Sequence, residues 1–424
     1  MKKIYAFAIS LMALIVIDTV ASYACTSVIA SGKITPDGRP MMWKNRDAGK
    51  RSNVMIHVAA DKTRETFAYT AIIDEEVKSI RSIWAGTNEV GFSIMNTMSY
   101  NVNRDTTEHG GKYNNGSFMR YAIERCTTVD DFEKLLQKTI KELETRKGGT
   151  GLATNFGVMD AKGNVAYFET GHHEYHKYDV NDPKVAPDGY LVRSNFSYNG
   201  LPVKAGKGQL RYEQADIKMK KALAENDVTP EFFLKHLCRS YANPLMKIDF
   251  LGETPKFEGW AYDTDFITRK TTLSSTVIKG IKKGENPDLV TMWTIISYPG
   301  TTVAMPVWVK GGKDGIPAML LADENVHAPL ADWGTELKMR AYSWDIDENP
   351  DNAKKYFNFG LLCNAYGTGI LQKVFNLEDE ILPPYRKSLE KWYKAGKVDV
   401  DEIKALNKVA DAWVAEFYKA NFGF

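Results

Sequence analysis

The sequence predicts an α+β fold in which one large domain carries a helical extension at its C-terminal end. Short runs rich in β-branched and aromatic residues, separated by turn signals such as Pro36-Asp37-Gly38, fill residues 25–91. Two segments with helical spacing, residues 117–126 and 129–143, follow before strand patterns resume. From about residue 377 the remaining chain has helical spacing. The order of these patterns is typical of a mixed fold.

The elements expected in the first half are mostly strands. We expect them at residues 26–30, 40–43, 54–58, 66–72 and 79–84, and later at residues 153–160, 165–169 and 190–193. Residues 86–91 predict a hairpin turn, and residues 92–95 continue its second strand. Asp130 and Asp131 lie in the first turn of the second expected helix, where acidic side chains favour a helix start.

The second half begins with helices and returns to strands. We expect helices at residues 209–225 and 230–240, and strands at residues 291–297, 301–309 and 318–321. In the tail, one apolar face is predicted by Ile403, Leu406, Ala410, Trp413 and Phe417. Repeats, low-complexity tracts and Ser/Gly/Pro linkers are absent from the sequence. We therefore expect one domain over residues 25–340 and a helical extension, residues 341–424, packed on it.

The composition is that of a globular chain with a substantial core, because 44% of its 424 residues are apolar and 25% are charged. Its formal net charge of +2 gives no electrostatic reason to expect nucleic acid or an anionic membrane as a partner. Beyond residue 24, no stretch is apolar for long enough to cross a bilayer.

The first 24 residues have the pattern of a signal peptide. Lys2 and Lys3 precede a mostly apolar stretch over residues 4–20, and Ser22 and Ala24 place small residues where a signal peptidase cleaves. A membrane anchor is the competing interpretation, but the apolar run is short and contains Asp18. We therefore expect signal peptidase to remove residues 1–24 and the protein to be exported, to the periplasm or the extracellular space.

Four cysteines, at positions 25, 126, 238 and 363, form no CxxC pair. An exported protein can join some of them as disulfides, and the sequence leaves that open. Cys126, Cys238 and Cys363 have apolar neighbours typical of buried thiols. Cys25 differs, because it directly follows the expected cleavage site. Three interpretations are open: an ordinary first residue, a lipidated anchor or a catalytic nucleophile. Ser22 and Tyr23 before Cys25 are unlike the usual lipoprotein signal, which argues against lipidation.

The catalytic interpretation of Cys25 has a specific chemistry. An N-terminal cysteine carries its thiol beside a free α-amine, whose ordinary pKa is roughly 7.7–8.0. Near neutral pH this amine can accept the thiol proton and later deliver it to a leaving amine. One residue then supplies both nucleophile and base, so no histidine is required. The sequence shows neither a GxSxG motif nor a clear Cys/His pairing.

Several motifs in order resemble N-terminal nucleophile hydrolases. The resemblance is to their choloylglycine hydrolase and penicillin V acylase branch, and to C45/C69 peptidases such as acyl-CoA:6-aminopenicillanic acid acyltransferase-like proteins. It covers roughly residues 25–310. The motifs are Cys25-Thr26-Ser27-Val28-Ile29-Ala30, Lys44-Asn45-Arg46-Asp47, Gly86-Thr87-Asn88-Glu89-Val90-Gly91 followed by Asn96, Phe156-Gly157-Val158-Met159-Asp160-Ala161-Lys162-Gly163, Val192-Arg193-Ser194-Asn195-Phe196, and Arg211.

This resemblance implies a four-layer αββα sandwich and a set of catalytic roles. Cys25 is implied as nucleophile and, through its α-amine, as base. Asp47 is implied to orient the amine or the thiol, although an Asp near a turn is often only an Asx-turn residue. Asn96 and Asn195 are implied as donors to the oxyanion. Arg211 is implied to hold the Asp47 carboxylate or to stabilise the thiolate.

One position departs from the family pattern. Lys44 stands where the family usually has arginine three residues before the aspartate, and Arg46 is a candidate substitute from the other face of the strand. This departure puts the substrate range in question more than the reaction. We expect neither cofactor nor metal. The alternative is a metal bound by the histidine cluster of His172, His173 and His176.

The sequence thus predicts hydrolysis of a linear amide through an acyl-thioester on Cys25. Dipeptidase activity or acyl transfer to an amine are alternatives on the same site. A lipidated surface protein with a binding role is the alternative of another class. Bile-salt conjugates, penicillins, N-acyl amino acids and short peptides all remain candidate substrates, and homo-oligomers are common in the resembling families. Two interpretations remain for three large aromatic residues: they line an acyl pocket, or they belong to the core. These residues are Trp84, Trp260 and Trp293.

Overall fold

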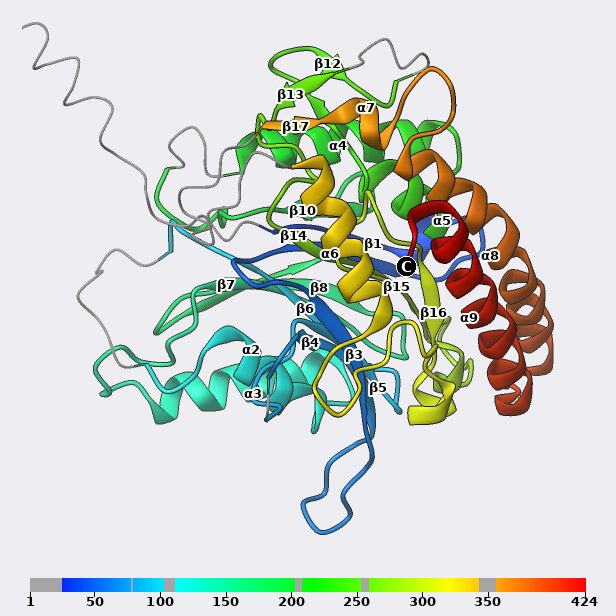
Figure 1. The fold of residues 1–424 in the computed structure, drawn as a ribbon. Coiled ribbons are helices and arrows are strands. Elements are labelled where there is room, and N and C mark those ends of the chain that lie inside the picture. The colour runs from blue at the N-terminus through cyan, green and yellow to red at the C-terminus, as the bar shows by residue number, and fades with distance from the viewer. Residues whose placement is uncertain (1–24, 78, 103–110, 203–207, 253–258, 343–355) are drawn as a thin grey trace, which may run out of the picture.

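The structure is a computed structural model that describes residues 25–424 except residues 78, 103–110, 203–207, 253–258 and 343–355. The predicted signal peptide, residues 1–24, lies outside the described residues. Two antiparallel sheets face each other, and helices cover the outer face of each sheet (Figure 1). The predicted α+β fold, a four-layer αββα sandwich, is therefore confirmed.

The first sheet contains the strand that follows Cys25. Its strands, in spatial order, are β10 (Tyr190–Arg193), β1 (Thr26–Ala30), β2 (Met41–Asp47), β14 (Thr272–Lys279), β15 (Thr291–Ile296) and β16 (Met305–Val307). Every residue of β1 and β2 is buried, because the second sheet covers one face and helices cover the other. Polar side chains on these strands therefore need protein partners or a role.

The second sheet is a meander in which spatial order follows chain order. Its strands are β3 (Asn53–Val58), β4 (Tyr69–Asp74), β5 (Ala85–Asn88), β6 (Ser93–Met98), β7 (Thr154–Met159), β8 (Val165–Thr170) and β9 (Tyr175–Asp179). The strand expected at residues 79–84 is wrong, and β5 begins at Ala85 instead. In that segment Ile83 N–H donates to the carbonyl of Gly116 at the start of a helix, at 3.2 Å, and only at Trp84 does the backbone return to β4, where Trp84 N–H donates to the Ile72 carbonyl at 2.9 Å.

Helices α2 (Asn115–Ile123) and α3 (Val129–Glu142) cover the outer face of the second sheet (Figure 1). Each begins with a capping box. Asn114 and Ser117 form the first, and Thr128 and Asp131 form the second. These boxes satisfy backbone N–H groups that the first helical turn leaves without partners. The acidic helix start predicted at residues 130–131 is confirmed.

Helices from two distant parts of the chain cover the outer face of the first sheet (Figure 1). They are α4 (Gln209–Ala224), α5 (Pro230–Phe232), the π-helical turn η2 (Phe233–Leu237) and, near the chain end, α8 (Ile370–Ala395). Helix α9 (Val400–Phe422) packs on α8. The predicted helical C-terminal segment is therefore present, and α8 begins before residue 377. The proposed division at residue 340 stays a prediction.

The buried face of α9 differs from the predicted one. Ile403 and Ala410 are buried as expected, but Trp413 is 43% exposed, and the stripe continues through Val414 and Tyr418. The predicted residues recur on average every 3.5 positions, and such a stripe drifts around a straight helix of 3.6 residues per turn, so packing selects the residues that meet the core. The Tyr418 hydroxyl donates to the carbonyl of Thr301 at 2.7 Å, which fixes this face.

Two other expected strands are shorter or absent. In the segment expected as a strand at 301–309, the Thr302 hydroxyl donates to the Ile296 carbonyl at 2.7 Å and closes a turn, so that only β16 is extended. Residues 318–321 form turns, and the N–H groups of Ala318 and Met319 donate to the carboxylate of Asp411 on α9. Side-chain partners thus take backbone groups in both segments, and at Leu321 only an isolated bridge to Met55 of β3 remains.

The remaining elements were not predicted. They include α6 (Pro329–Ala341), which packs beside β15, α7 (Phe359–Leu362), and two small ribbons that pair β11 (Ala242–Asn243) with β12 (Ile248–Asp249) and β13 (Trp260–Tyr262) with β17 (Tyr356–Asn358). Short 3-10 turns are η1 (Gly32–Ile34), η3 (Pro287–Leu289), η4 (Val309–Gly311) and η5 (Lys313–Gly315).

A buried ion pair ties α8 to the sandwich. The Arg239 guanidinium donates to both carboxylate oxygens of Glu378, at 2.8 and 2.7 Å, and both side chains are at most 1% exposed. Glu378 also accepts the N–H of Ala304 at 2.7 Å. Bidentate geometry and this extra donor offset the loss of hydration of the two charges.

We predict that Glu378→Ala lowers the free energy of unfolding by about 3–5 kcal/mol, because it leaves Arg239 buried without its counter-ion. Urea unfolding of the mature protein measures this loss. Glu336→Ala is the control, since the Glu336–Arg340 pair at 2.6 Å is solvent-exposed and such pairs contribute less than about 1 kcal/mol. Equal effects of the two substitutions would contradict the packing described for α8.

Candidate active site

Cys25 lies at the start of β1 and lines a cavity of about 240 Å³. The residue is 8% exposed. Four other residues singled out from the sequence line the same cavity, namely Lys44, Arg46, Asp47 and Asn96. The structure thus brings together five of the seven residues singled out, from three different strand regions.

The register of the first sheet explains this grouping. In the β1–β2 pair, Thr26 lies opposite Asn45 and Ser27 lies opposite Lys44. Side chains alternate along a strand, so Lys44 and Arg46 share one face, and the Asn45 amide on the other face donates to the Cys238 carbonyl at 2.8 Å. The prediction that Arg46 occupies the other face from Lys44 is therefore wrong. Both residues face the cavity.

Lys44 is a buried cation in this cavity whose hydrogen-bond partners carry no charge. Its ammonium donates to the carbonyl of Trp84 and to Oδ1 of Asn96, each at 2.9 Å. Both partners are neutral. Burial lowers the pKa of Lys44 to about 8, and negative charge on the neighbouring Cys25 sulfur opposes this shift. An ammonium has three N–H donors, so one remains for a group inside the cavity.

Arg46 is held by its own partners and does not replace the family's arginine. Its guanidinium forms an ion pair with Asp74 at 2.9 Å and lies over the Trp84 ring, 4.2 Å from the ring centroid. Burial lowers the pKa of Arg46, and Asp74 opposes that effect. The guanidinium therefore fixes one wall of the cavity.

Arg269, which sequence reasoning did not name, holds the Asp47 carboxylate. Arg269 Nε donates to Asp47 Oδ2, and the Thr272 hydroxyl donates to Oδ1, both at 2.7 Å. Burial raises the pKa of Asp47, although Arg269 and then Arg211 pull it down. The Cys25 sulfur lies 4.0 Å from the backbone carbonyl of Asp47. The resemblance implied Arg211 as a residue that holds the Asp47 carboxylate, but Arg269 is the arginine that donates to it.

Arg211 instead fixes the backbone of the cysteine. Its Nη1 donates to the Cys25 carbonyl at 2.7 Å and to the Thr26 hydroxyl at 2.8 Å. Its Nη2 donates to Asn195 Oδ1 at 3.0 Å, and its Nε donates to Asp265 at 2.9 Å. Gly208 makes room for this guanidinium, because a Cβ there would lie 2.4 Å from Nη2.

The two asparagines implied as oxyanion donors occupy different places. Asn96 lines the cavity, and its Nδ2 donates to the Thr154 hydroxyl at 3.0 Å. Asn195 is not among the described residues that line the cavity, and its Nδ2 donates to the Met98 carbonyl at 2.9 Å. Asn195 therefore stands behind Met98 and Arg211. The catalytic roles of both asparagines stay predictions.

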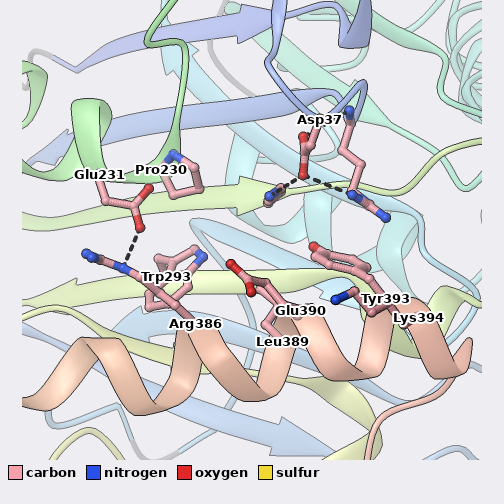
Figure 2. Close-up of a pocket in the computed structure, with 11 residues that line it drawn as sticks. Asp37, Pro230, Glu231, Trp293, Arg386, Leu389, Glu390, Tyr393 and Lys394 are labelled. Carbon is pink, nitrogen blue, oxygen red and sulfur yellow. Dashed lines mark hydrogen bonds and ion pairs between the residues drawn. The ribbon is translucent and has the colours of Figure 1, made fainter.

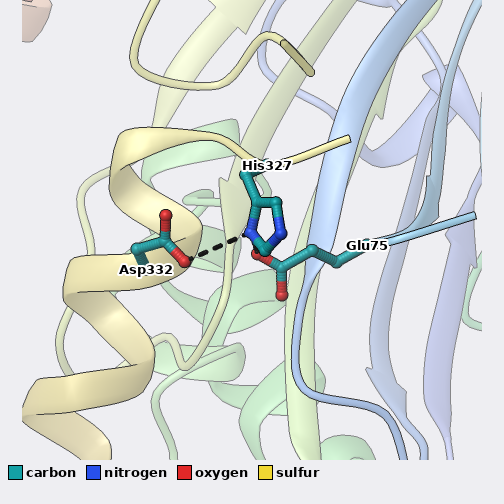
Figure 3. Close-up of side chains that lie close together, drawn as sticks. All are labelled: Glu75, His327 and Asp332. Carbon is teal, nitrogen blue, oxygen red and sulfur yellow. Dashed lines mark hydrogen bonds and ion pairs between the residues drawn. The ribbon is translucent and has the colours of Figure 1, made fainter. Parts of the chain in front are cut away.

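The histidines considered as metal ligands lie away from this cavity. His172, His173 and His176 lie on β9 and the turn before it, and His173 and His176 are exposed. A different group, Glu75, His327 and Asp332, brings ligand atoms within 4.8 Å of one another (Figure 3). The Arg51 guanidinium already bridges that pair of carboxylates, at 2.7 Å from Glu75 and 2.5 Å from Asp332.

A second cavity, of about 500 Å³, opens between the first sheet and α8 (Figure 2). Ion pairs line it, including Arg386 with Glu231 at 2.5 Å and Lys279 with Asp37 at 2.6 Å. None of the residues singled out as catalytic lines it. The chemistry predicted from the sequence therefore belongs to the smaller cavity at Cys25.

The described residues form no helix that is both long and apolar enough to span a bilayer. The four cysteines are free and buried in the structure.

The family comparison supports the resemblance drawn from the motifs. The family model for acyl-coenzyme A:6-aminopenicillanic acid acyl-transferase matches residues 34–211. The matched segment contains Lys44, Asp47, Asn96, Asn195 and Arg211, and Cys25 lies just before it. With the αββα sandwich, this match confirms the resemblance to N-terminal nucleophile hydrolases.

A search of curated protein sequences gives no significant match. Among solved structures, penicillin V acylase from Agrobacterium tumefaciens has a TM-score of 0.33 at 12% identity, over 68% of this chain and 86% of its own. A Caenorhabditis elegans ortholog of N-acylethanolamine-hydrolyzing acid amidase has 0.31 at 16%, over 60% and 92%. A mutant conjugated bile acid hydrolase from Clostridium perfringens has 0.39 at 11%, over 68% and 92%. At TM-scores below 0.5, these similarities do not bear on the chemistry of this chain.

We predict that Arg269→Met lowers the free energy of unfolding by about 3–5 kcal/mol at pH 7.5, because it leaves the Asp47 carboxylate buried without its counter-ion. The pKa of Asp47 then rises further above the unfolded value. Stability relative to wild type is lost above that raised pKa and recovers as the pH falls through it. Urea unfolding at pH 7.5 and pH 5 measures both values.

Arg340→Met on the exposed face of α6 is the matched control and should have little effect at either pH. A loss for Arg269→Met that is the same at both pH values would contradict the assignment of Asp47 as its charged partner.

Proposed function

We propose that this chain is an exported amide hydrolase whose nucleophile is Cys25, made N-terminal by signal-peptidase removal of residues 1–24. The observation that carries the proposal is the placement of the Cys25 thiol in a cavity beside Lys44, Asp47 and Asn96. The family match over residues 34–211 and the αββα fold support the same chemistry.

The α-amine of the mature protein serves as the base. It accepts the thiol proton while sulfur attacks the carbonyl carbon of a linear amide, and a tetrahedral oxyanion forms. When the C–N bond breaks, the ammonium returns the proton to the leaving amine, and the acyl group remains as a thioester on Cys25. Water then adds by the same route, releases the carboxylic acid and restores the thiol. The described lining of the cavity contains no histidine that could act as an alternative base.

Lys44 stabilises the negative charge that develops in these steps. Trp84 and Asn96 take two of its three N–H donors, and we assign the third to a group in the cavity that Lys44 lines together with the cysteine. A preorganised cation in a water-poor site acts strongly on a thiolate or an oxyanion, and losing one such donor costs about 3–4 kcal/mol of barrier. Asn96 is fixed by Lys44 and Thr154, and we assign it as the neighbouring donor to the oxyanion.

Acyl transfer is the second candidate, because the matching family model is named for it. The same thioester then reacts with an amine instead of water. Product analysis with and without an added amine acceptor separates the two reactions. An acylated amine as the main product at millimolar acceptor would assign the chain as a transferase, and free acid would assign it as a hydrolase.

We predict that Cys25→Ala lowers kcat/KM on N-acyl p-nitroanilides by more than about 10³-fold, because no other group supplies the nucleophile. Release of p-nitroaniline by the mature protein measures this. Cys126→Ala is the control. Cys126 is not among the residues that line the cavity, and burial raises the pKa of its thiol to about 12. A Cys25→Ala protein with wild-type activity would end the proposal.

We predict a bell-shaped pH dependence of kcat/KM with a maximum close to pH 8. The rate rises as the α-amine loses its proton, at a pKa of roughly 7.7–8.0. It falls as Lys44 loses its proton above its pKa of about 8. Lys44→Arg, which keeps its charge at high pH, should preserve the acidic limb and remove the alkaline one. An alkaline limb unchanged in Lys44→Arg would show that Lys44 does not act as a cation in the reaction.

A further inference from the structure

The charged side chains that line the cavity at Cys25 do not balance. The lining contains two carboxylates and three cations, namely Asp47, Asp74, Lys44, Arg46 and Lys50. Charges inside a protein act on one another and on a ligand more strongly than they would in water. The sign of the excess therefore indicates which kind of ligand the cavity attracts.

Both carboxylates of the lining are already neutralised by arginines. Asp74 forms an ion pair with Arg46 at 2.9 Å, and Asp47 forms one with Arg269 at 2.7 Å. The partners of Lys44 are the neutral oxygens described above. The positive charge that remains in the lining therefore belongs to its two lysines.

Lys50 extends the wall of the cavity beyond β2. It lies in the irregular stretch between β2 and β3, three residues after Asp47, and it is exposed to solvent. Within the described part of the chain it has neither a hydrogen-bond partner nor an ion-pair partner. The next residue, Arg51, differs, because it bridges the carboxylates of Glu75 and Asp332. Lys50 can therefore bind a charged group that enters the cavity.

A third lysine adds to the positive field. Lys338 on α6 is 6% exposed, and it has no hydrogen-bond or ion-pair partner among the described residues. Burial lowers the pKa of Lys338 to about 8, and the charges of Lys270 and Arg51 act in the same direction. Carboxylates oppose this shift in the pKa, and Asp47 is one of them. Lys338 is thus within electrostatic range of a residue that lines the cavity.

A carboxylate on the substrate complements this excess of positive charge. An ammonium and a carboxylate form charge-assisted hydrogen bonds, which are shorter and stronger than neutral ones. Because Lys50 is exposed, such a pair keeps part of its hydration and avoids the cost of a fully buried ion pair. Lys44 is assigned to the charge that develops on the sulfur or the oxyanion. A second negative group would therefore bind at Lys50.

We propose that Lys50 binds a carboxylate that the substrate carries close to its scissile amide. The enzyme therefore acts on anionic amides in preference to neutral amides of the same shape. The carboxylate belongs to the acyl half or to the amine half of the substrate, and matched substrates distinguish the two. This inference rests on the proposed hydrolase function and specifies its substrate class.

Two pairs of substrates, each matched in shape, test the preference. In the first pair the acyl half of a p-nitroanilide is glutaryl or its uncharged monoamide, 4-carbamoylbutanoyl. In the second pair a pentanoyl group is joined to glycine or to glycinamide. We expect kcat/KM for the anionic member to exceed that for the neutral member by about fivefold in one of the pairs, which identifies the half that carries the carboxylate. The ratio should fall in about 1 M salt, which screens charges. A ratio near one in both pairs overturns the proposal.

Substitutions assign the preference to Lys50. Lys50→Met should lower the ratio of kcat/KM for the anionic and neutral members about threefold to fivefold, because it removes the charged partner of the carboxylate. Lys50→Arg, which keeps the positive charge, should retain most of the ratio. Lys408→Met, at an exposed position on α9, is the control and should keep the wild-type ratio. A ratio unchanged in Lys50→Met would show that this side chain does not bind the carboxylate.

A labelling measurement separates this inference from the hydrolase proposal. Iodoacetate and iodoacetamide alkylate the same thiol and differ in charge. The ratio of their rates at Cys25 of the mature protein should fall about threefold in Lys50→Met, because a positive charge that acts on the anionic reagent is lost. This result without turnover of any amide would refute the hydrolase and retain the anion site. Hydrolysis of both members of each pair at equal rates, with a labelling ratio that Lys50→Met leaves unchanged, would retain the hydrolase and refute the anion site.

Discussion

The rest of the site depends on the hydrogen bonds that the Arg211 guanidinium donates. Through its N–H groups it joins the carbonyl of Cys25, the hydroxyl of Thr26, the amide of Asn195 and the carboxylate of Asp265. Arg269 continues the chain, because it binds Asp265 at 2.6 Å and Asp47 at 2.7 Å. A continuous line of charge-assisted hydrogen bonds thus runs from the backbone of the cysteine to the buried carboxylate beside it.

This network holds the start of the first strand firmly at Cys25. If Cys25 is the N-terminus of the mature protein, as we propose, such an end would ordinarily fray, since the ends of chains are poorly ordered unless other groups hold them. Here the Cys25 carbonyl is bound at 2.7 Å by a side chain that is itself 1% exposed. In the proposed mechanism, the thiol and the α-amine can then keep one position relative to Lys44 and Asn96, which is what preorganised catalysis requires.

The charged side chains of the site differ in how their burial is compensated. Lys44, Arg46 and Asp47 are all buried, and burial works against the charged form of each. Arg46 and Asp47 have oppositely charged partners, whereas Lys44 has only neutral ones. A buried ammonium such as Lys44, which loses hydration without gaining a charged partner, is characteristic of a functional site. Its partner there is the negative charge that develops during the reaction.

Much of this arrangement follows from local sequence. Short patterns predict a cleavage site before Cys25 and the strands that carry Lys44, Asp47 and Asn96, and these residues line the cavity together. Arg269 escaped prediction because the segment before β14 carried no assigned element. Its contact with Asp47 spans 222 positions of sequence. Residues 79–84 were expected to be a strand, but the start of α2 supplies the backbone partner of Ile83 there. Contacts of this kind depend on how elements pack, which periodicity does not encode.

The central claim is that Cys25 is the free N-terminal nucleophile of the mature protein. Its most direct test is the intact mass of the protein recovered from the export compartment, before and after limited treatment with iodoacetamide. We predict a mass that begins at unmodified Cys25, with that residue alkylated fastest and activity lost in parallel. A mass raised by fatty acyl groups on Cys25, or a chain that starts at any other residue, would remove the α-amine base and contradict the account.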